Sequence, residues 1–186
     1  MAKRVCPWWL GYFLACPWRR FLQDPAKILA AYVREGMTVL EPGPGMGFFT
    51  LELARRVGAS GRVIVAEIQP KMLDRLKRRA EKAGLLGRLD ARLARPESMN
   101  LDDLGGQVDS AFALAVVHEV ADTESFFLEI ARCLKPGGLL LVAEPPGHVN
   151  AERFEKELAA AARAGLHLVD RPVIPHSRAA LLKKGQ

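Results

Sequence analysis

The chain has 186 residues, of which 49% are hydrophobic and 26% are charged, with a formal net charge of +6. This length suits one domain with a sizeable core, and we expect the mixture of apolar and charged residues to make the protein soluble. Three scattered cysteines without a C-x-x-C pair exclude a disulfide framework and predict a reducing compartment.

The first 23 residues are apolar and rich in aromatic side chains. These aromatic residues include Trp8, Trp9, Tyr12 and Phe13. The stretch is similar to a signal peptide, but Pro7 interrupts it and it is too short to span a bilayer. We expect residues 1–23 to cover the ligand edge of the domain formed by residues 24–186. Docking on a membrane surface and a homodimer contact through the same side chains are the alternatives.

Short apolar runs alternate with helical periodicity along the rest of the chain. Predicted strands cover residues 37–41, 62–67, 88–93, 108–116 and 138–144. Predicted helices cover residues 24–33, 48–57, 70–84, 122–134 and 151–164. A crossover helix between most of these strands implies parallel pairing. Only three residues separate 166–174 from 178–183, which allows a hairpin, so the last strand should be antiparallel.

The turn after the first strand is the most informative segment. Glu41 ends the strand, and Gly43, Gly45 and Gly47 follow at alternate positions. Glycines let a backbone turn tightly and approach a ligand closely. The spacing differs from the dinucleotide fingerprint G-x-G-x-x-G, and no Lys or Ser follows as in a phosphate-binding loop. A carboxylate at Glu41 would repel phosphate but could pair with an amine, so we expect a nucleoside that carries an amino acid.

This E-P-G-P-G-M-G segment resembles the first motif of class I S-adenosylmethionine-dependent methyltransferases. The predicted strand 62–67 ends at Glu67, 20 residues after Gly47, where family members hold both ribose hydroxyls. Residues 69–73, 108–114 and 134–142 resemble further family elements in the expected order. The resemblance implies an α/β, Rossmann-like, doubly wound sheet of seven strands in the order 3-2-1-4-5-7-6, with the last strand antiparallel.

The same resemblance implies S-adenosylmethionine as the cofactor and methyl transfer as the reaction. The residues that it implies for cofactor contact lie in the glycine turn, after the second and third strands and at the end of the fourth. They are Glu41, Gly43, Pro44, Gly45, Gly47, Glu67, Ile68, Met72, Pro96, Glu97 and Leu114. Arg95 stands where many members have an acid for the adenine amine, so adenine should meet backbone groups or Glu97 there.

His118 and Glu119 follow the fourth strand, beside the expected methyl group. We expect His118 to contact the acceptor or act as a general base, with Glu119 as the second candidate. A histidine that only bonds the backbone is the structural alternative. His148 and His176 are further histidines that could face the pocket. Glu144 begins an E-P-P-G segment. Amino-methyltransferases that act on DNA bases resemble one another in a D/N/S-P-P-aromatic motif after the fourth strand. The segment here follows the fifth predicted strand and lacks the aromatic residue, so it does not indicate that function.

The chain has no separate substrate domain, so we expect a small-molecule acceptor and in-line methyl transfer in the cytoplasm. An RNA or protein methyltransferase and a non-catalytic S-adenosylmethionine-binding protein are the alternatives. Much of the positive charge falls on the predicted helix 70–84 without interleaved aromatic residues, which is more typical of a solvated face than of a nucleic-acid surface. Cys6 and Cys16 leave an arsenic acceptor open, but their spacing matches no regular zinc site, so no metal is predicted.

Overall fold

The structure, a computed structural model, describes residues 23–186. The predicted cap and the membrane-surface and homodimer contacts depend on residues 1–22, which lie outside the described residues. Within residues 23–186, no helix combines the length and apolar character that crossing a membrane requires.

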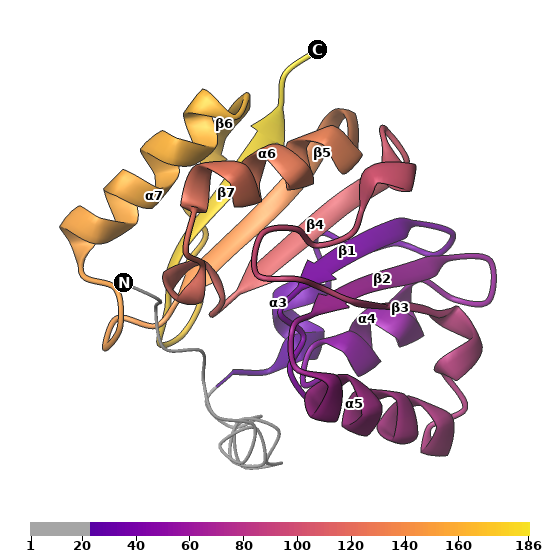
Figure 1. The fold of residues 1–186 in the computed structure, drawn as a ribbon. Coiled ribbons are helices and arrows are strands. Elements are labelled where there is room, and N and C mark those ends of the chain that lie inside the picture. Colours follow the sequence, from indigo (N-terminus) through magenta and orange to yellow (C-terminus); the bar gives the residue numbers. More distant parts are fainter. Residues whose placement is uncertain (1–22) are drawn as a thin grey trace.

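Seven strands form one sheet in the order β3-β2-β1-β4-β5-β7-β6 (Figure 1). The strands are β1 (Thr38–Pro42), β2 (Arg62–Glu67), β3 (Leu89–Leu93), β4 (Val108–Leu114), β5 (Leu134–Glu144), β6 (Leu166–Asp170) and β7 (Arg178–Lys184). Neighbouring strands from β3 to β5 pair in parallel, whereas β7 pairs antiparallel with both β5 and β6. The predicted strand order and the antiparallel last strand are therefore confirmed.

Helices cover both faces of this sheet, as Figure 1 shows. The helices are α3 (Pro25–Leu29), α4 (Thr50–Arg56), α5 (Pro70–Lys82), α6 (Thr123–Cys133) and α7 (Ala151–Arg163). Alternate residues of β4 face opposite sides, as expected for a strand with both faces buried. Ala111 and Ala113 belong to the core formed with α6 and α7, while Phe112 belongs to the core formed with α3, α4 and α5.

Two predicted strands extend too far at their carboxyl ends. The strand predicted at 108–116 ends at Leu114, because Ala115 has φ +58° and turns the chain out of the sheet. The strand predicted at 166–174 ends at Asp170, and a proline follows at position 172. Proline has no N–H to donate to a neighbouring strand. The turn after β4 is consequently longer than expected, and it carries His118.

Four other predicted boundaries are wrong by two residues or more, and one of them is the end of the helix predicted at 70–84, which lies at Lys82. The helix predicted at 24–33 ends at Leu29, and the next residues form a turn in which the N–H groups of Tyr32 and Val33 both bond to the Leu29 carbonyl. The helix predicted at 48–57 begins at Thr50, because the glycine turn continues through residue 49. The strand predicted at 138–144 begins at Leu134, since β4 pairs with it again before a register shift.

Candidate functional site

Three buried carboxylates lie at the carboxyl-terminal edge of the sheet. Glu41 is 3% exposed, Glu67 4% and Glu144 0%, and they lie at the ends of β1, β2 and β5. A buried carboxylate is costly unless hydrogen bonds compensate for the water it has lost. Each of the three accepts at least one such bond. The edge of the sheet is therefore a polar site beside the apolar core.

The glycine turn between β1 and α4 is held by its own backbone bonds. Gly43, Gly45 and Gly47 all have positive φ, at +64°, +55° and +81°. Their N–H groups donate to the Ala66 carbonyl (2.9 Å), to Glu67 Oε2 (3.0 Å) and to the Pro44 carbonyl (2.9 Å). Positive φ is inexpensive only for glycine. The protein's own hydrogen bonds therefore hold the turn in this conformation.

The three glycines differ in the space around them. A Cβ on Gly43 would lie closer than 3.0 Å to Val116 Cγ2, and one on Gly47 closer than 3.0 Å to Leu76 Cδ1. A Cβ on Gly45 would meet only Met72 Sδ, at 3.8 Å. Packing within the protein, together with the positive φ, therefore disfavours any side chain at Gly43 and Gly47. At Gly45 the neighbouring protein atoms leave the backbone open to close approach.

Glu67 joins this turn to the end of β2. Its Oε2 accepts from Gly45 N and its Oε1 accepts from Gln69 N at 2.9 Å. Burial raises the pKa of Glu67, and these backbone bonds oppose that rise. A carboxylate has about four acceptor positions, so each oxygen can also accept a ligand hydroxyl. This geometry suits a pair of neighbouring hydroxyls.

Glu41 lies behind the turn and accepts from Thr50 Oγ1 at 2.6 Å. Burial raises the pKa of Glu41 to about 7, and the nearby charge of Glu67 adds to the rise while the Thr50 bond opposes it. A nearby cation would favour the ionised form of this carboxyl. Glu41 is thus poised to respond to a positively charged ligand at neutral pH.

His118 lies on the turn η4 (Val117–Glu119) after β4, and Glu144 holds it from the end of β5. Glu144 Oε1 accepts from Val116 N at 3.0 Å and Val117 N at 2.8 Å, and its Oε2 bonds to His118 Nδ1. Because two N–H groups already hold this carboxylate as an acceptor, Nδ1 is the donor to it. The Nε2 nitrogen then carries the lone pair, 3.9 Å from Glu119 Oε1.

Charges around His118 raise its pKa. Burial lowers the pKa, but the hydrogen bond and charge of Glu144, with the charge of Glu119, outweigh it. The charge of Glu119 also contributes to the raised pKa of Glu67, after the larger effect of burial. An imidazole oriented by a buried carboxylate is the arrangement of many general bases.

The other two predicted histidines, His148 and His176, differ in their surroundings. The His148 ring stacks on the His118 ring, with centroids 5.0 Å apart and planes at 19°. Arg153 on α7 donates to both backbones, at 2.8 Å to the His118 carbonyl and 3.2 Å to the His148 carbonyl. His176 lies on the turn between β6 and β7, where its φ is +56°.

The remaining predicted cofactor residues flank the glycine turn and the strand ends. Pro44 is buried within the turn, Met72 is buried on α5 beside Gly45, and Ile68 and Leu114 are half-buried. Pro96 and Glu97 form the exposed tip of a tight turn, where Arg95 N donates to the Ser98 carbonyl at 2.7 Å. The structure thus brings Glu41, the glycine turn, Glu67 and His118 to one edge, with Pro96 and Glu97 on the loop after β3.

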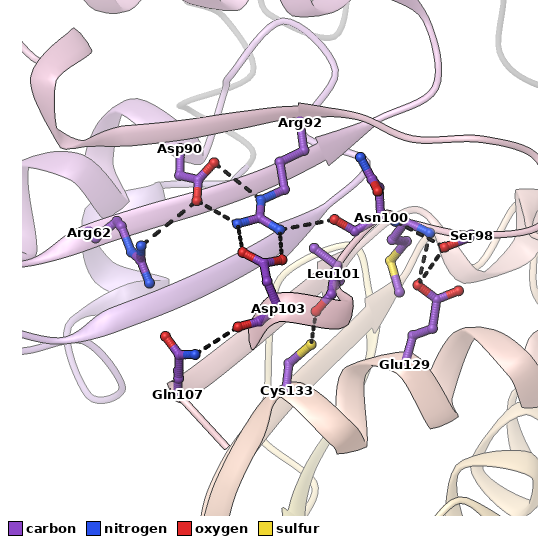
Figure 2. Close-up of polar contacts among 11 residues, drawn as sticks. Arg62, Asp90, Arg92, Ser98, Asn100, Leu101, Asp103, Gln107, Glu129 and Cys133 are labelled. Carbon is purple, nitrogen blue, oxygen red and sulfur yellow. Dashed lines mark hydrogen bonds and ion pairs between the residues drawn. The ribbon is translucent and has the colours of Figure 1, made fainter. Parts of the chain in front are cut away.

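A polar network holds that loop in place, as Figure 2 shows. Arg92 on β3 bonds to both oxygens of Asp90 and to Asp103, and it donates to the Asn100 carbonyl at 3.0 Å. On the other side, Glu129 of α6 accepts from Met99 N at 2.8 Å. The hydrogen bonds from Arg92 lower the pKa of the Asp103 carboxyl. The connection that carries Pro96 and Glu97 is therefore anchored to both β3 and α6.

Sequence reasoning missed the roles of three side chains of this site: Thr50, Glu144, and Arg79 of α5, whose Nη1 donates to the Met46 carbonyl in the glycine turn. Glu144 could have been found, because it ends a parallel strand with an acid just as Glu41 and Glu67 do. Thr50 and Arg79 gave no such signal, since their partners depend on how α4 and α5 pack. Among residues 23–186, no group of three or more His, Cys, Asp and Glu side chains is arranged to hold a metal ion.

A family model described as a methyltransferase domain matches residues 40–142, more than half of the chain. The chain belongs to the class I S-adenosylmethionine-dependent methyltransferases. S-adenosylmethionine is accordingly its cofactor. The open backbone at Gly45 and the carboxylate of Glu67 fit that ligand, which presents a ribose and an amino acid to the protein.

Known proteins of this methyltransferase family extend the comparison. The ubiquinone/menaquinone biosynthesis C-methyltransferase UbiE of Enterobacter sp. (strain 638) is 33% identical over 127 residues, 68% of this chain and 48% of that protein. The chain therefore spans about half the length of the curated relatives it matches. A SAM-dependent methyltransferase from Aquifex aeolicus has a TM-score of 0.84 and 25% identity, covering 96% of this chain and 98% of that one. A Methanococcus maripaludis structure, at 13% identity and a TM-score of 0.78, covers 100% of this chain and 98% of its own and shares the fold.

Proposed function

We propose that this methyltransferase acts on a small-molecule acceptor that loses a proton, and that His118 accepts that proton. The observation that carries this proposal is the bond from His118 Nδ1 to the fully buried carboxylate of Glu144. It orients the ring and leaves Nε2 as the nitrogen able to take a proton. A histidine needed only for packing gains little from a buried partner that must itself be held by two N–H groups.

We assign the cofactor contacts to the groups gathered around the glycine turn. Glu67 accepts from both ribose hydroxyls, Glu41 pairs with the amine, and the open backbone of Gly45 allows close approach. We assign the adenine contacts to residues near the strand ends, namely Ile68, Pro96, Glu97 and Leu114. When bound, the cofactor supplies a methyl group that a sulfonium has already activated. The support for these assignments is the set of hydrogen bonds and burial described above.

The protein then has two tasks in an in-line displacement. It aligns the acceptor atom and excludes water, and it removes the acceptor proton where that proton hinders attack. His118 Nε2 takes the proton, and Glu144 stabilises the resulting imidazolium through Nδ1. Glu119, close to Nε2, adds a second negative charge beside this cation.

The first acceptor class to test is a hydroquinone. Its support is the name of the relatives, which describes a C-methyltransferase of quinone biosynthesis. When the hydroxyl gives its proton to His118, the adjacent ring carbon becomes nucleophilic enough to take the methyl group. The new bond to carbon then replaces a C–H bond, whose proton is lost as the hydroxyl is restored. We place this reaction in the cytoplasm, where the cofactor is made.

Labelled methyl transfer tests the proposal. The protein is incubated with S-adenosyl[methyl-¹⁴C]methionine and 1,4-naphthohydroquinone, and both the labelled ring and S-adenosylhomocysteine are measured. We expect equal amounts of the two products, and a rate at least about a hundredfold lower in His118→Gln, as for loss of a general base. His167→Gln, which changes an exposed histidine on β6, is the matched control. An unchanged rate in His118→Gln would contradict the assigned role.

An RNA acceptor is the second candidate, and one observation favours it. Four exposed cations of α5 recur at helical spacing on one face: Lys71, Arg75, Arg78 and Lys82. RNA binding that weakens steeply with salt, and is lost when these cations are neutralised, would favour this candidate.

We also propose that residues 1–23 cover the acceptor side of the site. The support from the described residues is the attachment of Gln23, whose side chain donates to the Pro175 carbonyl at 3.0 Å and to Ser177 Oγ at 2.8 Å. Arg178, which follows Ser177, begins β7 and pairs with Glu144 of β5, at the same sheet edge as His118. Increased amide protection of residues 5–18 on addition of S-adenosylhomocysteine, independent of protein concentration, would support a cap. Protection that depends only on concentration would point to a homodimer contact.

A further inference from the structure

One face of α5 follows the glycine turn closely. A Cβ on Gly45 would meet Met72 Sδ at 3.8 Å, and a Cβ on Gly47 would overlap Leu76 Cδ1. Residues four apart lie on the same side of a helix, one turn above the other. Met72 and Leu76 are both buried, at 4% and 0% exposed. The helix therefore forms the floor beneath the turn.

Arg79 continues this row, three residues after Leu76. Its side chain reaches from α5 to the turn, where Nη1 donates to the carbonyl oxygen of Met46. Burial and the charge of Arg75 lower the pKa of Arg79, but a guanidinium stays protonated throughout the physiological range. A permanently charged donor thus holds the one residue that lies between Gly45 and Gly47.

Opposite charges hold the two ends of this short unit. Gly45 N donates to the Glu67 carboxylate at the end of β2, and the carbonyl of the next residue, Met46, accepts from the Arg79 guanidinium on α5. Charge-assisted hydrogen bonds are roughly twice as strong as neutral ones. A turn of three positive-φ glycines has many alternative conformations, so two such bonds at successive residues select one of them.

We infer that Arg79 is a positioning residue for S-adenosylmethionine, which acts through the Met46 carbonyl to keep Gly45 and Glu67 in their binding geometry. Release of the Met46 carbonyl lets the turn move, and the Gly45–Glu67 bond moves with it. Arg79 itself contacts the turn rather than the ligand. The inference rests on the cofactor contacts proposed for Gly45 and Glu67, and it is independent of the acceptor.

The test compares three substitutions on one helix. Arg79→Met removes the donor and keeps an apolar stem, whereas Arg79→Lys keeps a cationic donor. Arg78→Met is the control, because it removes an exposed cation at the preceding position. The readouts are the calorimetric affinity for S-adenosylhomocysteine, amide exchange at residues 43–49 without ligand, and the melting temperature.

We expect Arg79→Met to bind S-adenosylhomocysteine roughly tenfold more weakly, as for loss of one hydrogen bond to a charged group. Exchange at the amides of Gly45 and Gly47 should rise while the rest of the sheet keeps its protection. Arg79→Lys should recover most of the affinity, and Arg78→Met should bind like the wild type. Wild-type affinity in Arg79→Met would overturn the inference.

Two other outcomes are equally decisive. Faster exchange across the whole sheet in Arg79→Met, with a matching fall in melting temperature, would make Arg79 a general structural residue and overturn the inference. Failure of the wild type itself to bind S-adenosylhomocysteine would refute the proposed cofactor contacts instead. Because exchange is measured without ligand, the hold of Arg79 on the turn is tested separately from those contacts.

Discussion

Replacing the glycines of the turn by alanine, one at a time, should separate packing from ligand contact. All of them have positive φ, so each alanine costs about 1–2 kcal/mol of folding free energy in backbone strain. Gly47→Ala adds a methyl that overlaps the buried Leu76, which costs a further 1–3 kcal/mol or so. Gly45→Ala meets only Met72 Sδ at 3.8 Å, so strain is its whole cost.

The two variants should therefore fail in different ways. Gly47→Ala should lose about 2–5 kcal/mol of unfolding free energy, and part of that loss should disappear in the Leu76→Ala background, where the overlapping methyl has space. Gly45→Ala should lose no more than about 2 kcal/mol yet bind S-adenosylhomocysteine at least about tenfold more weakly, since its Cβ occupies the side open to the ligand.

Urea unfolding and calorimetry measure both quantities on the same preparations. Gly36→Ala is the matched control, because Gly36 has φ +83° and its Cβ would have only an ordinary contact, 3.7 Å from Ser60 Oγ. It should show the strain cost without any change in affinity. If Gly45→Ala binds S-adenosylhomocysteine as tightly as Gly36→Ala does, the glycine turn is not the cofactor cradle.

Two further predictions concern the buried carboxylates. Glu67→Ala should weaken S-adenosylhomocysteine binding by about 1.5–3 kcal/mol, because it removes the ribose acceptor and the partner of Gly45 N together; unchanged calorimetric affinity in the folded variant would refute the assignment. Glu41 has a folded-state pKa of about 7 against a usual 4.5, so the folded protein binds the extra proton and its unfolding free energy should fall as pH rises from 4.5 to about 7, then level off. Glu41→Gln should flatten that pH dependence in urea titrations, and an unchanged slope would show that another group causes it.

Periodicity and strand-end acids were sufficient to predict the parallel sheet, the glycine turn and the place of Glu67. These features are local, because a strand, its last residue and the turn after it are contiguous in the sequence. The order of the strands came from the family resemblance rather than from the pattern of apolar residues. Boundaries failed where tertiary contacts decide, as at Ala115, whose positive φ ends β4 early.

The pairing of His118 with Glu144 could not be predicted from the sequence, because it depends on which strands are neighbours in the sheet. The two residues are 26 positions apart and meet only because β4 and β5 are neighbours whose carboxyl ends coincide. The Arg79 bond to Met46, across 33 positions, likewise depends on how α5 packs under the turn. Such contacts follow from the fold, whereas the candidate residues on each side follow from the sequence.

The orientation of His118 is the central claim, and nitrogen NMR of its imidazole in the free protein tests it most directly. We predict that Nδ1 carries the proton in the neutral ring while Nε2 is unprotonated, and that the ring titrates with a pKa above the usual 6.5. Glu144→Gln should lower that pKa and mix the two tautomers. A neutral ring protonated at Nε2, or a titration that Glu144→Gln leaves unchanged, would contradict the assignment of His118 as the base that Glu144 orients.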